Sequence, residues 1–183
     1  MKLGVICDGI SRDLRHALKV MDEFGLDYAE LQFVWDKEVG DHDASEIAQI
    51  KELLDTHNKP VSCLSRHIFA GLTTASKAGD KDHSRHMDYL KRVIEMAHQL
   101  DCPLVRIMTS KKEQILWGTN GAEHWNVAKG AWDTLPPLIA PAVDLARTEG
   151  VTLVVETGNG TMVNSNYTAC LLYTSDAADE PLC

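Results

Sequence analysis

The chain has 183 residues, of which 44% are hydrophobic and 25% are charged, as is usual for one soluble globular domain. No apolar run approaches the roughly 20 residues that span a bilayer, and the start MKLGVICDGI lacks the apolar core and cleavage site of a signal peptide. A cytoplasmic protein without a membrane partner is therefore predicted. The formal net charge of −9 argues against a nucleic-acid partner, because such binding depends on Lys and Arg that neutralise phosphates.

Short apolar strands alternate with amphipathic helices along the chain. Strands are predicted within residues 2–10, 28–35, 60–70, 103–110 and 151–160. Helices are predicted within residues 11–25, 43–58, 82–100 and 131–150. This alternation is typical of βα units, so an α/β fold with a parallel sheet is predicted.

Two of the helices carry specific signals. The first is expected to bury one face and to end at Gly25, the apolar positions being Leu14, Ala17, Leu18, Met21 and Phe24. The last helix contains Pro136, Pro137 and Pro141, which are expected to break or kink it.

Charged residues on one face of the strands distinguish two architectures. In 28–35, Glu30 and Gln32 share one face; Arg106 and Glu156 interrupt the apolar pattern of two later strands. Helices cover both faces of an open parallel sheet, where such charges would be costly. A barrel lumen can pair them and open them to a site at its mouth. The pattern favours a partial (β/α)8 TIM barrel of about five βα units, with an open doubly wound parallel sheet as the alternative.

Polar residues at the strand ends are the candidate site, because barrels keep their chemistry there. The candidates are Asp8, Trp35, Asp36, Ser65, Arg66, His67, Thr109, Ser110, Glu156 and Asn159. Several of the polar residues named so far also have a purely structural interpretation. Glu30 and Arg106 are then predicted to neutralise each other, and Asp8 and Asp36 to begin turns or cap helices. His67 is interpreted in the same way as a hydrogen-bonded core histidine. Of all the candidates, Glu156 is the strongest.

Five segments together resemble the sugar phosphate isomerase/epimerase family, whose fold is the xylose isomerase-like TIM barrel. They are MKLGVICDG, YAELQFVW, SRHIF, CPLVRIM and VTLVVETGNGTMVNSNYTA, and the resemblance runs from residue 1 to about residue 169. It implies that Glu156 is a ligand of a divalent metal (Mn²⁺, Mg²⁺, Co²⁺ or Zn²⁺) and is also placed to exchange a proton with substrate. It further implies that His67 and Asn159 contact the substrate. The remaining ligands, an Asp, a His and a Glu, come from strands six to eight of the family.

The resemblance implies a metal-dependent isomerase or epimerase. Its partner would be a small sugar or sugar phosphate, a hydroxy-ketone or hydroxy-aldehyde whose carbonyl the metal polarises while carboxylates move the proton. A homo-oligomer of the full-length protein is compatible with it. Two alternatives remain: a metal phosphodiesterase similar to abasic-site endonucleases, and a sugar-binding barrel without turnover.

The last residues differ from the rest. Residues 170–180 match the translation of a transposase sequencing adapter, so 170–183 are interpreted as a non-native tail and 1–169 as the N-terminal part of a barrel. Cys7, Cys63 and Cys102 are then the native cysteines, and they show no paired spacing. Without strands six to eight, this chain is expected to be inactive and poorly stable.

Overall fold

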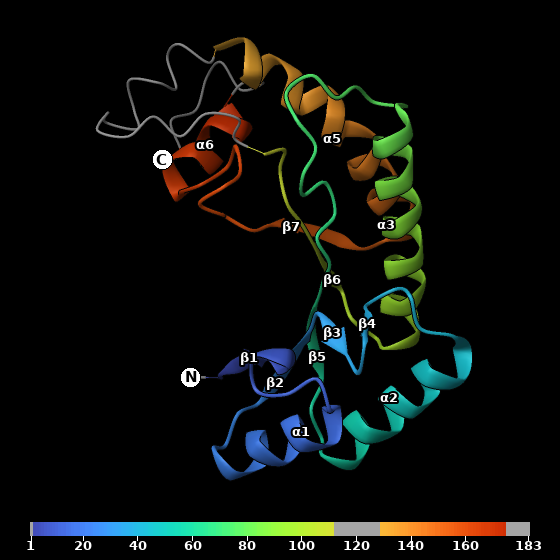
Figure 1. The fold of residues 1–183 in the computed structure, drawn as a ribbon. Coiled ribbons are helices and arrows are strands. Elements are labelled where there is room, and N and C mark those ends of the chain that lie inside the picture. The colour runs from blue at the N-terminus through green and yellow to red at the C-terminus, as the bar shows by residue number, and fades with distance from the viewer. Residues whose placement is uncertain (1, 112–128, 175–183) are drawn as a thin grey trace. The chain divides into compact units, whose positions relative to one another are not determined.

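The computed structural model describes residues 2–111 and 129–174 (Figure 1). Contacts divide the chain into two compact units. The first unit comprises the described residues of 1–66, 88–106 and 146–154, and the second unit those of 67–87, 107–145 and 155–183. Within the described residues, no helix is both long enough and apolar enough to cross a lipid bilayer.

Strands and helices alternate as the sequence predicts. The strands are β1 (Gly4–Ile6), β2 (Tyr28–Leu31), β3 (Phe33–Val34), β4 (Lys37–Glu38), β5 (Val61–Ser65), β6 (Leu104–Ile107) and β7 (Thr152–Val155). The helices are the short 3-10 turn η1 (Cys7–Gly9), α1 (Leu14–Glu23), α2 (Ala44–Thr56), α3 (Lys81–Gln99), α5 (Lys129–Glu149) and α6 (Asn166–Thr174).

Five strands form one sheet in the order β1-β2-β5-β6-β7. The pairs β1–β2, β2–β5 and β5–β6 are parallel, with Leu31 opposite Leu64 and Leu64 opposite Val105. Each successive βα unit thus adds its strand beside the previous one, whereas a doubly wound sheet reverses its order at a switch point. Sequential order is that of a (β/α) barrel, so the prediction of a partial barrel is confirmed. Among the described residues the sheet is open, and β1 and β7 are its edges.

The strand predicted over residues 28–35 is two strands. β2 belongs to the main sheet, whereas β3 pairs antiparallel with β4, Phe33 lying opposite Glu38. Trp35 and Asp36 form the turn between them, and Trp35 has a φ of 54°. The β3–β4 hairpin is too short for a periodic hydrophobic signal, and for this reason the sequence did not predict it.

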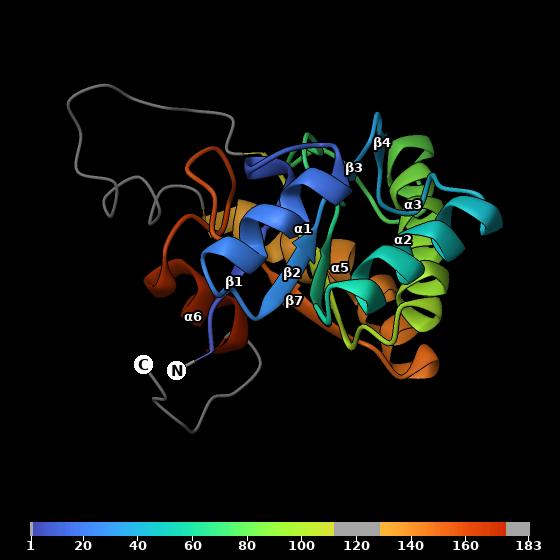
Figure 2. The same cartoon turned by 90° about the horizontal axis from the view of Figure 1, so that it is seen from below.

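The helices of the first unit follow their local signals closely. Asp43 caps α2 in a capping box with Glu46, and Asp13 caps α1 by accepting from the Arg15 amide at 3.1 Å. Leu14, Ala17, Leu18 and Met21 are buried as predicted. Figures 1 and 2 show α1 and α2 on the same side of β1, β2 and β5. Phe24, by contrast, is 75% exposed, because it lies past the last helical turn, where Gly25 (φ 65°) redirects the chain.

The prolines of α5 do not break it, so that part of the prediction is wrong, while a kink stays a prediction. The helix continues from Lys129 to Glu149 with Pro136, Pro137 and Pro141 inside. Each proline removes one helical N–H donor. The apolar face is nevertheless buried, and tertiary packing contributes more to helix stability than propensity does. The buried residues of this apolar face of α5 include Leu135, Leu138, Ile139 and Ala142.

Candidate functional site

Three chain segments at the carboxyl ends of strands β5, β6 and β7 lie side by side in the second unit. They are residues 67–72, 107–111 and 155–163, here called the strand-end layer. The first and second segments are joined by bonds from the amide of Met108 to the carbonyl of Ile68 (2.9 Å) and from Lys111 to Leu72 (2.5 Å). The second and third are joined from Met162 to Ser110 (2.9 Å). The layer therefore extends three neighbouring strand ends, where the sequence places the candidate site.

Glu156 follows β7 directly. Its amide donates to the carbonyl of Ile107 at 3.1 Å, so its backbone is held in the layer, and its side chain is exposed. A carboxylate at an exposed strand end is accessible to a ligand. This position agrees with the predicted role of Glu156, while the role itself remains a prediction.

Asn159 lies on a turn that the next residues close. The Thr161 hydroxyl lies 2.9 Å from the carbonyl of Gly158 and 2.8 Å from that of Val163, and the Thr161 amide donates to Gly158 at 3.0 Å. A Cβ on Gly158 would lie 3.3 Å from the end of the Met108 side chain and 3.3 Å from Cγ2 of Thr161, so the chain is closely packed at this turn. Asn159 is exposed on this turn, three residues beyond Glu156.

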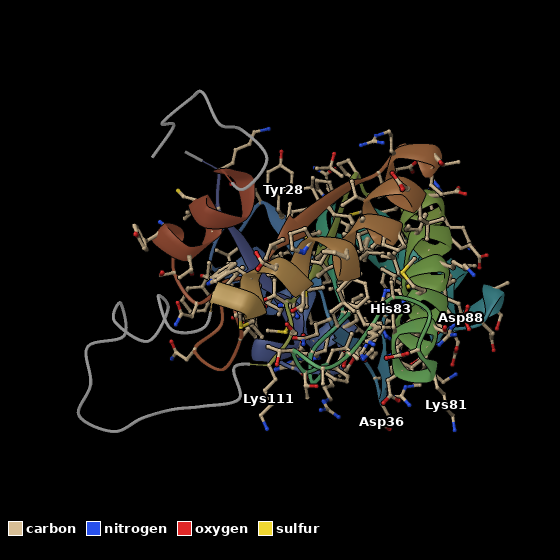
Figure 3. All side chains as sticks on the ribbon, turned by 90° about the horizontal axis from the view of Figure 1, so that it is seen from above. Tyr28, Asp36, Lys81, His83, Asp88 and Lys111 are labelled. Atoms are coloured by element: carbon tan, nitrogen blue, oxygen red, sulfur yellow. The ribbon has the colours of Figure 1, made fainter. Side chains whose placement is uncertain are left out.

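Thr109 and Ser110, two other candidates, are structural. Both are buried, and the Thr109 hydroxyl accepts from the Val163 amide at 2.9 Å. These contacts fix the third segment of the layer against the second. Lys111, which follows them, is exposed, and its side chain points outward in Figure 3.

His67 occupies the first segment of the layer and is exposed, so the interpretation as a core histidine is wrong. The structure places His67, Glu156 and Asn159 in the same unit, on two segments separated by residues 107–111.

The candidates of the first unit are held by structural contacts. Asp8 accepts from the Phe33 amide at 3.3 Å, which links η1 to the β3–β4 hairpin. The Ser65 hydroxyl donates to Glu30, and Arg106 lies 4.0 Å from the same carboxylate, which confirms that Glu30 and Arg106 neutralise each other. Trp35 and Asp36 form the hairpin turn, as the structural interpretation of Asp36 expected.

Arg66 is likewise structural, which the sequence did not predict. It is 4% exposed and donates to the Val39 carbonyl at 2.7 Å and to Asp41 at 2.8 Å. Its guanidinium also lies 4.2 Å from the centre of the Tyr89 ring. His67, the next residue, lies beyond the end of β5 as well, but it is exposed and does not share this role.

The described residues do not complete a metal site. Within 2–111 and 129–174, no group of three or more His, Cys, Asp or Glu side chains could hold a metal ion. The buried thiols are poor nucleophiles, because burial raises the pKa of Cys7 to about 12 and that of Cys63 to about 11 and so disfavours the reactive thiolate. The metal-ligand role of Glu156 therefore stays a prediction.

Comparison with protein families gives one match. A family model described as a xylose isomerase-like TIM barrel matches residues 18–179, most of the chain. The matched range includes residues 170–179 of the segment interpreted as a tail, so the origin of that segment stays a prediction. No curated protein matches the chain significantly.

Solved structures share the fold at low identity. The 3-keto-D-glucoside 4-epimerase YcjR from E. coli, in its apo form, has 14% identity and a TM-score of 0.59, over 95% of this chain and 63% of that one. The IOLI protein with a bound zinc atom has 18% identity and a TM-score of 0.64, over 96% and 59%. A family 2 AP endonuclease from Brucella melitensis has 16% identity and a TM-score of 0.62, over 96% and 64%. The chain thus spans about three fifths of the length of each.

Proposed function

The chain belongs to the family of xylose isomerase-like TIM barrels, and from this membership we propose that the complete protein is a metal-dependent isomerase or epimerase. Its substrate is a sugar or sugar phosphate with a carbonyl next to a hydroxyl-bearing carbon, and it acts in the cytoplasm. The observation that carries the proposal is Glu156, an exposed carboxylate directly after β7, in one layer with His67 and Asn159.

Each of the three residues has a proposed role. Glu156, as a carboxylate, is one ligand of a divalent cation and exchanges a proton with the carbon next to the carbonyl. His67 and Asn159 orient the substrate, because both side chains can donate and accept hydrogen bonds with sugar hydroxyls. A divalent cation, when bound, would polarise the carbonyl and make that proton easier to remove. Carboxylate oxygen suits Mg²⁺ or Mn²⁺, and the comparable IOLI structure holds zinc.

Substitution of Glu156 tests this function. In the complete gene product, purified without metal and screened on ketoses and hydroxy-aldehydes with added Mn²⁺, Mg²⁺, Co²⁺ or Zn²⁺, we expect Glu156→Gln to lose both metal affinity and turnover. Glu52→Gln is the matched control, because it makes the same chemical change at an exposed position of α2. Activity of Glu156→Gln close to that of the control would refute the assignment. We expect no turnover from residues 1–169 alone, because the family resemblance places the other metal ligands on strands six to eight, which this segment lacks.

An abasic-site endonuclease is the second candidate, since one of the similar structures is an AP endonuclease. The net charge of −9 disfavours it, because phosphodiester substrates are polyanionic. Metal-dependent nicking of DNA with an abasic site, without turnover of any sugar, would favour the endonuclease. Saturable sugar binding with neither reaction would favour a non-catalytic barrel.

We also propose that residues 170–183 are not native to the protein. The support is the eleven-residue match of 170–180 to a translated adapter. Reading the genomic DNA through codon 170 tests it: a different continuation, rich in charged helix formers, is expected. An identical genomic sequence would show that the segment is native.

A further inference from the structure

Phe69 occupies an unusual backbone conformation two residues after His67. Its φ is 66°, in the left-handed region that side chains other than glycine rarely adopt, and it is completely buried. A bulky residue in this region is strained unless its surroundings hold it there. The chain therefore turns sharply at Phe69 because of specific contacts.

Two buried histidines of α3 supply contacts that hold this turn. The Phe69 amide donates to Nδ1 of His86 at 3.1 Å, and the ring of His83 stacks on the Phe69 ring, with centroids 5.5 Å apart and planes 11° apart. His83 is 3% exposed and His86 8%. All three residues belong to the second unit.

His83 also ties the loop after Phe69 to α5. Its Nδ1 accepts from the Gly79 amide at 3.1 Å, and its Nε2 lies 2.9 Å from the carbonyl of Leu138. A carbonyl only accepts, so Nε2 of His83 carries the proton and Nδ1 is the acceptor. His83, labelled on α3 in Figure 3, is thus a neutral imidazole that bridges two parts of the second unit. His86 likewise has an unprotonated Nδ1, because a backbone amide donates to it.

The turn that these histidines hold is part of the strand-end layer. The residue between His67 and Phe69 is Ile68, whose carbonyl accepts from the Met108 amide at 2.9 Å. The direction of the backbone at His67 is therefore fixed on one side by β5 and on the other by the Phe69 turn. A change of the Phe69 conformation would move His67 relative to this layer.

We propose that His83 and His86 are positioning residues, which fix His67 for substrate binding by holding the Phe69 turn: His86 accepts from the Phe69 amide through Nδ1, and His83 stacks on the Phe69 ring. The kinetic part of this inference rests on the proposed function. The structural part, that these two histidines hold the turn, does not depend on it. Neither histidine contacts the substrate.

Substitution of His83 or His86 by asparagine or glutamine tests whether the histidine acts as a hydrogen-bond acceptor or only fills space. The Oδ1 of Asn can take the place of Nδ1, whereas the amide of Gln reaches the place of Nε2. His86→Asn therefore retains an acceptor for Phe69, and His86→Gln loses it. At position 83, Asn retains the acceptor for Gly79 and Gln retains the donor to Leu138. His98→Gln is the control, because His98 lies near the end of the same helix and its side chain is 48% exposed.

The first measurement is hydrogen exchange of residues 67–72 in the complete gene product. We expect His86→Gln to speed exchange of the Phe69 amide on the order of tenfold or more, with His86→Asn and His98→Gln close to wild type. Exchange in β6 should not change in any variant. Equal exchange at Phe69 in the Asn and Gln variants of His86 would overturn the inference.

The second measurement separates positioning from general damage. With the sugar that the metal screen identifies, we expect His86→Gln to raise KM on the order of tenfold and to change kcat much less, while His86→Asn restores KM. A faster Phe69 exchange with unchanged KM would refute the positioning role. If no sugar is turned over by wild type, the proposed function fails, and the exchange data alone decide whether the histidines hold the turn.

Discussion

Nη2 of Arg66 lies 2.8 Å from Oδ2 of Asp41, and this ion pair joins the end of β5 to the segment that follows β4. The Arg66 side chain is only 5% exposed, and its Nε lies 3.4 Å from Glu38. Asp41 is shared with Arg92, whose Nη2 lies 2.7 Å from Oδ1. The β3–β4 hairpin is thus held on β5 and α3 by a charge network within the first unit.

Removal of the Arg66 charge is expected to destabilise the first unit. Arg66→Met leaves Asp41 and Glu38 without their buried partner. Loss of one member of a buried pair costs about 3–5 kcal/mol, and partial exposure of Asp41 lowers our expectation to about 2–3 kcal/mol. Urea denaturation of Arg66→Met and of the control variant Arg85→Met measures the change in the free energy of unfolding. Arg85 pairs with Asp82 at the surface, where such a pair contributes less than about 1 kcal/mol. Equal losses in the two variants would contradict a structural role of Arg66.

The same network predicts a pH dependence. Desolvation raises the pKa of Asp41, but hydrogen bonds from Arg66 and Arg92 outweigh it, so the pKa lies below its ordinary value of 3.8. A carboxyl group with a lowered folded-state pKa stabilises the fold above the unfolded-state pKa, and this stabilisation is lost as pH falls through the folded-state pKa.

Asp41→Asn should therefore lower the free energy of unfolding by a constant amount above about pH 5. The difference from wild type should shrink as the pH falls below 3.8. Denaturation curves from pH 7 to the acid limit of solubility measure it. In an Arg66→Met background the pH-dependent part should be smaller, because one of the two cations is missing. A difference that grows toward acid would contradict the assignment.

The buried thiols are expected to resist alkylation. Burial raises the pKa of Cys7 from 9.0 to about 12, so its thiolate fraction near pH 8 is about a thousandfold below the ordinary one. Cys63 is shifted in the same direction, to about 11. Iodoacetamide near pH 8, followed by peptide mapping, should leave both unmodified in the native protein and label both in urea. Rapid native labelling of Cys7 would show that the first unit opens or that the thiol is not buried.

Much of the first unit could be predicted from the sequence, because its signals are local. The period of α1 predicted the burial of Leu14 and Met21, and the strand alternation predicted the pairing of Glu30 with Arg106. Phe24 was mispredicted because helical periodicity does not show where the last turn ends. The same uncertainty affects most helix boundaries.

The contacts that decide the roles of site residues are long-range and could not be predicted. Arg66 and His67 are adjacent in the sequence, yet one is buried by the β3–β4 hairpin and the other is exposed. That hairpin has two-residue strands, which carry no periodic pattern. The turn at Phe69 depends on His83 and His86, more than a dozen residues further along the chain. No local signal indicates a non-glycine residue at positive φ.

The last prediction concerns Gly40, which packs directly against α3. A Cβ at this position would lie 2.9 Å from Cγ2 of Val93 and 3.0 Å from its backbone nitrogen. The φ of Gly40 is 87°, so an L side chain would be strained there even without the contact. Gly71 has the same φ of 87°, but a Cβ there would meet no atom within 4 Å. The two glycines therefore separate backbone strain from steric overlap.

We expect Gly71→Ala to lower the free energy of unfolding by about 1 kcal/mol, from the left-handed conformation alone. Gly40→Ala should cost a further 1–3 kcal/mol or so, the usual range for overpacking a well-packed interior. Urea denaturation of the two variants beside wild type measures the difference. The backbone nitrogen of Val93 belongs to a helix and cannot move as a side chain can, so rearrangement of rotamers should not relieve the overlap. Equal losses would mean that α3 shifts away from Gly40 at little cost, and that the close approach does not hold the hairpin segment on the helix.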